Sequence, residues 1–108
     1  MTIEEEFNIF WSMYPIKEDK KKCLAKYKKI NNSYAVFRNM FSYVSSVYYD
    51  HCEGFKRRYK NPLTFLNGVD TEVEGALSDT SFLLGEIKEK INACKNLSSP
   101  KYVGKGYL

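Results

Sequence analysis

The stretch that decides the fold is residues 34–52, YAVFRNMFSYVSSVYYDHC. Its apolar side chains recur about every 3.6 residues, which is typical of one buried face of an α-helix. These positions are Phe37, Met40, Phe41, Val44, Val47 and Tyr48. A strand over residues 43–49 is the alternative, because tyrosine and valine favour strands. The helical period continues on both sides of that segment, so we expect a central helix here.

Two helices are expected before the central one. Thr2 and Glu5 have the spacing of a capping box, in which each side chain bonds the other residue's backbone N–H. An apolar stripe follows at helical spacing, and Pro15 disfavours helical geometry at the residue before it. The stripe consists of Phe7, Phe10, Trp11 and Tyr14. A lysine-rich helix is expected over residues 17–30, and Ser33 is expected to cap the central helix.

Two shorter helices are expected after it. Gly54 ends the central helix, and Asn61 with Pro62 predicts the start of a short helix over residues 62–67 that Gly68 closes. Residues 69–80 resemble an acidic linker. A last helix is expected over residues 80–95, capped by Ser78 or Asp79. Its apolar line consists of Leu84, Ile87, Ile91 and Cys94.

These patterns predict an all-α fold, a small bundle of about four to five helices. Residues 1–97 are expected to form a single helical domain, and residues 98–108 an irregular tail whose aromatic side chains can dock on the body. Of the 108 residues, 44% are hydrophobic and 16% aromatic. Aromatic side chains bury large areas each, so even this short chain can form a core.

Several classes of function are disfavoured. His51 is the only histidine, so a serine or cysteine catalytic centre would have to use it. The three cysteines lack the spacing of a zinc site or a disulfide framework, and no glycine-rich phosphate loop is present. We therefore expect no enzyme activity, catalytic residue, metal, cofactor or small-molecule substrate. The acidic start lacks the features of a secretory signal, and no segment is apolar enough for a membrane span, so a cytoplasmic location is expected.

The positive charge lies in the first two thirds of the chain. Residues 1–68 carry 12 Lys or Arg and 7 Asp or Glu, whereas residues 69–108 carry 5 and 6. Two basic clusters result, and together they form the predicted nucleic-acid-binding site: Lys17, Lys20, Lys21, Lys28 and Lys29, then Lys56, Arg57, Arg58, Tyr59 and Lys60. If Pro62 brings them side by side, they form one surface that can follow a phosphate backbone. Tyr59 or Phe55 can stack on the bases of a single strand. The alternative is that these lysines only solvate a helix face.

Two blocks of sequence resemble a segment of phage and prophage replication proteins, in initiator or helicase-loader-like chains. The pattern there is F-x-x-F-W-x-x-Y-P-x-K, then spaced lysines with A-x-x-x-W, and later P-x-T-W-L-N. The matching residues here are Trp11, Tyr14, Pro15 and Lys17, then Pro62, Thr64, Phe65, Leu66 and Asn67. Tyr27 and Phe65 stand where that family more often has tryptophan. The resemblance covers about residues 7–68.

This resemblance implies a small accessory protein of phage-type DNA replication that binds nucleic acid, DNA in preference to RNA, without catalysis. A winged-helix domain often precedes the segment in that family and is absent from this sequence. The alternative is therefore a protein-interaction module that docks on a host or phage replication or transcription machine and recruits or inhibits it. A phage-encoded protein would act in the host cell cytoplasm. The motif aromatics themselves are expected to be structural.

Overall fold

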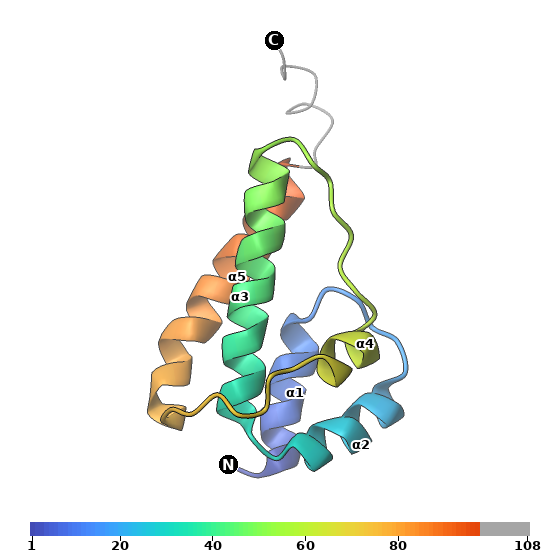
Figure 1. Cartoon of the computed structure of the whole chain (residues 1–108), viewed down its shortest axis with the longest axis vertical. Helices are drawn as coiled ribbons and strands as arrows, with labels where there is room; N and C mark the ends of the chain where they lie inside the picture. The colour runs from blue at the N-terminus through green and yellow to red at the C-terminus, as the bar shows by residue number, and fades with distance from the viewer. Residues whose placement is uncertain (98–108) are drawn as a thin grey trace.

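The computed structural model describes residues 1–97, with the side chains of residues 1–95 (Figure 1). Its elements are α1 (Ile3–Met13), α2 (Lys20–Ile30), α3 (Ser33–Cys52), α4 (Pro62–Asn67), the 3-10 helix η1 (Leu77–Asp79) and α5 (Thr80–Leu97). The described residues contain no strand, which confirms the predicted all-α bundle of four to five helices. The predicted irregular tail, residues 98–108, lies outside the described residues.

The longest packing interface joins α3 and α5, which lie side by side and run in the same direction (Figure 1). Because they are parallel, residues 53–79 must return the chain along the length of α3. A helix of the 20 residues in α3 is about 30 Å long. Residues 55–61, which contain no regular secondary structure, cover the first part of this return and lead into α4. The second basic cluster is therefore stretched along the bundle.

The predicted helix boundaries are largely confirmed. The backbone N–H of Thr2 donates to Glu5 Oε1 at 2.7 Å, and the backbone N–H of Glu5 donates to Thr2 Oγ1 at 3.1 Å. Asn61 caps α4 by accepting from the backbone N–H of Leu63 at 2.9 Å, with Pro62 as the first helical residue. These local signals operate within four residues, which is why they can be read from sequence.

Three details of the prediction are wrong. The cap of α3 is Asn32, whose side chain accepts from the backbone N–H of Ala35, while Ser33 is already helical. The lysine-rich helix begins at Lys20 rather than residue 17, because Asp19 has a left-handed backbone with φ of 57°. In α5 the first buried apolar residue is Leu83, and Leu84 is only partly buried.

The motif aromatics form the centre of the core, as predicted. Phe10, Tyr14 and Tyr27 are fully buried and Phe65 nearly so. The Phe10 and Phe65 rings stack with centres 5.9 Å apart, and the Tyr14 and Phe65 ring centres are 5.5 Å apart. Such ring pairs each stabilise a fold by about 0.5–1.5 kcal/mol beyond the area that they bury. This cluster joins α1, α2 and α4, and it therefore determines where the two basic clusters lie.

A buried polar chain joins the first three helices at one end of the bundle. The Tyr27 hydroxyl donates to Ser33 Oγ at 2.9 Å, and the Ser33 hydroxyl donates to the carboxylate of Glu6. Glu6 and Ser33 are buried. Burial raises the pKa of the Tyr27 hydroxyl well above its usual range, so it stays protonated and can donate. Partners of this kind offset the cost of burying a carboxylate.

The acidic linker is tied to α3 by two asparagine side chains. Asn39 bonds both the N–H and the carbonyl of Asp70, at 3.0 and 3.2 Å. Asn32 donates to the carbonyls of Thr71 and Val73, both at 3.1 Å. Asparagine can bond a backbone in this way because its amide holds both a donor and an acceptor. The linker is therefore positioned by α3.

Candidate nucleic-acid interface

Two tyrosine hydroxyls hold the C-terminal end of the basic segment, residues 55–60, to the bundle. The Tyr14 hydroxyl donates to the backbone carbonyl of Lys60 at 2.6 Å, and the backbone N–H of Lys60 donates to the Tyr43 hydroxyl at 2.7 Å. Burial raises the pKa of the Tyr14 hydroxyl far above its usual range, so it remains a donor at any physiological pH. Both backbone groups of Lys60 are thus bonded, while its side chain is exposed.

The alternate side chains at Arg57 and Tyr59 contact the bundle. Arg57 forms an ion pair with Asp50 at 2.7 Å and donates to Ser46 Oγ at 3.0 Å. The Tyr59 ring packs edge-on against Tyr14 and Tyr43, with ring centres 6.4 and 5.9 Å away. Successive side chains of an extended backbone point to opposite sides. Because Arg57 and Tyr59 point toward the bundle, Lys56 before them and Arg58 between them point to solvent.

Lys56 and Arg58 are those outward side chains. Both are exposed, and neither has an ion pair or a hydrogen bond among the described residues. Arg57 and Tyr59, by contrast, act mainly as anchors. The prediction that Tyr59 offers its ring to a base does not agree with its packing, because its neighbours are two tyrosine rings of the bundle.

The N-terminal end of α2 lies next to the C-terminal end of the basic segment. The side-chain amide of Asn61 donates to Glu18 Oε1 at 2.6 Å, and α2 packs against α4 (Figure 1). Glu18 comes just before α2, so Lys20 and Lys21 in its first turn lie near Lys60. The Asn61–Glu18 bond thus joins a residue just before α2's first turn to the residue after the basic segment, and a single binding surface made by both clusters stays a prediction. Two carboxylates, of Glu18 and Asp19, lie within the same region.

The other end of α2 is not part of this junction. Lys28 lies eight residues along the helix from Lys20, which is about 12 Å at the rise of an α-helix. It forms an ion pair with Glu4 of α1, with Lys28 Nζ 3.0 Å from the Glu4 carboxylate. Lys29, beside it, is exposed. A single surface through all ten predicted residues would therefore have to extend along α2 by at least about 12 Å.

Lys17 has a structural role that the sequence did not show. Its ammonium group donates to the backbone carbonyls of Trp11 and Tyr14, the second at 2.7 Å. It also lies 5.6 Å from the centre of the Trp11 ring. The last carbonyls of a helix lack partners within the helix, and a cation there also favours the helix dipole. Lys17 therefore caps α1, and loss of solvent around it lowers its pKa, with Lys20 contributing.

The residues that remain available for a ligand form what we call the basic surface. It consists of Lys20, Lys21, Lys56, Arg58 and Lys60. Lys20 and Lys60 also lie over the rings of Trp11 and Tyr43, at 6.0 and 5.3 Å from the ring centres. Contacts of this kind are weak at exposed sites and leave the ammonium group hydrated.

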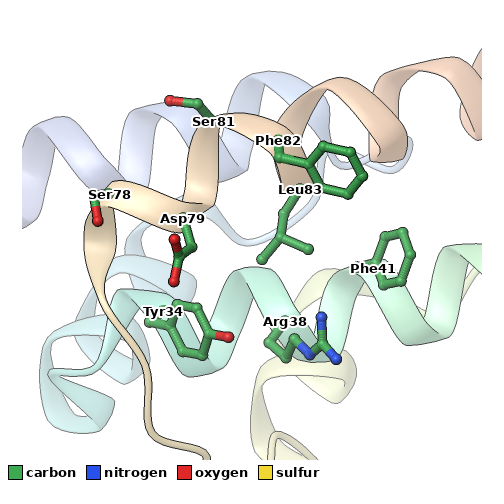
Figure 2. A pocket seen from close by; sticks show the side chains of 8 residues that line it. All are labelled: Tyr34, Arg38, Phe41, Ser78, Asp79, Ser81, Phe82 and Leu83. Carbon is green, nitrogen blue, oxygen red and sulfur yellow. The ribbon is translucent and has the colours of Figure 1, made fainter.

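A second surface feature was missed by the sequence reasoning. It is an open hollow of about 530 Å³ between α3 and the start of α5 (Figure 2). Tyr34, Arg38 and Phe41 line one side, and η1 and the first turn of α5 line the other. Phe82, which lines it, is 70% exposed. The sequence could have indicated this exposed apolar side chain through the run Phe82-Leu83-Leu84. Three successive apolar residues on a helix cannot all face the core, so at least one is exposed.

Several side chains are of types that take part in catalysis or metal binding. His51 is half-buried, and its Nε2 atom lies 3.1 Å from the backbone carbonyl of Arg57. No group of three or more His, Cys, Asp or Glu side chains within residues 1–97 is arranged to hold a metal ion. No helix in the same region has both the length and the apolar character to cross a bilayer.

The chain matches the model of a known family. The model of the Legionella vir region protein LvrA C-terminal domain matches residues 2–69. The chain belongs to this family. The LvrA C-terminal domain region of the chain contains α1 to α4, including every residue of the basic surface, whereas η1 and α5 follow it. No curated protein and no solved structure is significantly similar to the chain. The resemblance to phage replication proteins falls within the same residues and stays a prediction.

Proposed function

We propose that this protein binds nucleic acid, without catalysis, through the basic surface. The observation that carries the proposal is that Lys56 and Arg58 are held outward on an anchored segment, with no carboxylate paired to either among the described residues. A lysine that only solvates a helix needs no such anchoring. Here two tyrosine hydroxyls and the Arg57–Asp50 ion pair hold the segment in place.

The expected ligand contact is with phosphates. Cationic side chains that neutralise phosphates release bound counterions, which makes affinity strongly dependent on salt and independent of sequence. The described surface offers lysine and arginine side chains but no helix that projects outward to enter a groove, so base-specific readout is not expected. The resemblance to phage replication proteins supports DNA as the ligand and an accessory role in replication. It also supports a location in the cytoplasm of a host cell.

The test is fluorescence anisotropy with labelled DNA at several salt concentrations. We expect binding that weakens as salt rises, and an affinity about tenfold lower at low salt for Arg58→Glu. The matched control is Lys88→Glu, which makes the same charge change at an exposed position on α5. Equal losses for the two variants would mean that only net charge matters, and no binding by the natural protein at low salt would refute the proposal.

The hollow between α3 and α5 favours a second candidate, a protein-interaction module acting on a replication or transcription machine. Phe82 exposes apolar surface beside Arg38 and Asp79, which can orient a partner. Affinity capture from host lysate with the natural protein and with Phe82→Ser tests this candidate. A partner that Phe82→Ser loses and Arg58→Glu keeps would favour it over nucleic-acid binding.

A further inference from the structure

Two aromatic side chains are exposed at the C-terminal end of α3, where the basic segment begins. Tyr49 is 64% exposed and Phe55 is 68% exposed. They belong to one helix end, because the backbone N–H of Phe55 donates to the carbonyl of Asp50 at 2.8 Å and that of Gly54 donates to His51 at 3.1 Å. Gly54 has a positive φ of 94°, so the turn is a Schellman motif. This turn places Phe55 over the last turn of α3, which carries Tyr49.

The fold does not account for the exposure of these rings. In a Schellman motif the residue at the position of Phe55 often packs on an apolar side chain one turn back. The two candidate positions here are Asp50, which is engaged by Arg57, and Tyr49. Tyr49 and Phe55 stay 64% and 68% exposed, so any contact between them buries neither ring. Tyr43 and Tyr59, by contrast, are packed in the aromatic cluster. Burying a phenylalanine ring stabilises a fold, and Phe55, which is 68% exposed, contributes little stability in this way.

Cationic side chains follow the rings directly. Lys56 is the next residue, and Arg58 lies two residues further on, about 7 Å along an extended backbone. Both point away from the bundle, whereas Arg57 between them is paired with Asp50. An exposed ring beside outward cations on a rigid segment has the two components by which proteins hold unpaired nucleic acid: stacking on bases and attraction for phosphates.

We infer that the ligand is a single-stranded nucleic acid whose bases stack on Phe55 and Tyr49 while Lys56 and Arg58 contact its phosphates. This inference rests on the proposed function. A duplex stacks its bases on one another, so the faces that a ring needs are not available. A single strand exposes those faces, and stacking then tolerates any base. Phe55 and Tyr49 distinguish the two forms, whereas the basic surface alone does not.

The test compares a labelled oligothymidine of about 16 nucleotides with a duplex of the same length, in anisotropy titrations at low salt. We expect the natural protein to bind the single strand more tightly. Phe55→Ala and Tyr49→Ala are each expected to lower that affinity about tenfold and to leave duplex binding unchanged. Phe82→Ala is the matched control, since it removes an equally exposed ring at the other end of α3 and α5. Circular dichroism establishes that each variant is folded.

The outcomes separate this inference from the proposed function. If both DNA forms bind and the ring variants lose no affinity for the single strand, the single-strand inference is wrong and the proposed function stands. The same conclusion follows if the duplex binds at least as tightly and depends equally on the rings. If neither form binds at low salt, the proposed function fails. The exposed rings would then be assigned to a protein contact.

Discussion

Replacing Lys17 by methionine separates a structural lysine from a binding one. Methionine keeps most of the aliphatic chain but removes the ammonium group that donates to the carbonyls of Trp11 and Tyr14 at the end of α1. A net hydrogen bond stabilises a fold by about 0.5–1.5 kcal/mol, and a cation at a helix C-terminus by about 0.3–1 kcal/mol. Because the site is partly exposed, we expect Lys17→Met to lower the free energy of unfolding by about 1–2 kcal/mol.

Thermal unfolding followed by circular dichroism measures this effect. A loss of 1 kcal/mol lowers the Tm of a domain of this size by about 4–8 °C, which is easily resolved. The matched control is Lys21→Met on α2, where the side chain is exposed and has no ion pair or hydrogen bond among the described residues. Lysine and methionine have similar helix propensity, so Lys21→Met is expected to keep the natural Tm.

DNA binding is expected to rank the two variants in the opposite order. Each phosphate contact contributes about 0.7 to the slope of log affinity against log salt concentration for a single strand. Lys21→Met is expected to reduce the slope by about this amount, and Lys17→Met to leave it unchanged. The reasoning is refuted if Lys17→Met unfolds at the natural temperature and reduces the slope as much as Lys21→Met does.

Three further predictions concern the body of the fold. Gly75→Ala is expected to destabilise the protein by about 1–3 kcal/mol, because a Cβ there would overlap the Tyr34 ring; Tyr34→Ala in the same chain should restore most of the loss in urea denaturation. Cys52 is exposed and the other two cysteines are buried, so one thiol should react quickly with a thiol reagent and the others only on unfolding. Acid unfolding tests the capping box: hydrogen bonds from Thr2 lower the pKa of Glu5 in the folded state, so the stability from this pair is present above the usual Glu range and lost as pH falls through the lowered pKa. Glu5→Gln keeps an acceptor for the backbone N–H of Thr2 but cannot titrate, so it should reduce the loss of stability below about pH 4.5, and an unchanged pH profile would contradict this assignment.

The signals that predicted the fold correctly are local ones. The capping box at Thr2, the Asn61-Pro62 start and the Gly54 stop each depend on bonds between residues a few positions apart, and α3 is set by the period of its own side chains. Such features can be predicted without knowing how the rest of the chain folds. The displaced cap at Asn32 shows the limit, because Ser33 instead takes part in a bond to Glu6, 27 residues earlier.

The candidate site was predicted less well because it depends on how the chain reverses. Lys17 caps α1 only because the backbone turns back at Pro15 and reaches a left-handed conformation at Asp19. Nothing in a count of lysines distinguishes it from Lys20. Similarly, Arg57 and Tyr59 are inward because the segment is extended and anchored, and a sequence of six basic and aromatic residues does not reveal its own alternation.

The residues that make the fold and those proposed to bind the ligand are different. Phe10, Tyr14 and Phe65 form the buried cluster, and Tyr14 also bonds the backbone of Lys60, so the core holds the basic segment by its main chain. A main-chain bond does not depend on which side chains the segment carries. Substitutions at positions 56 and 58 are therefore expected to leave the fold intact while they alter the proposed binding. Because the segment is already held by these bonds, the proposed binding would cost little conformational entropy, so the proposal requires only modest contacts with the ligand.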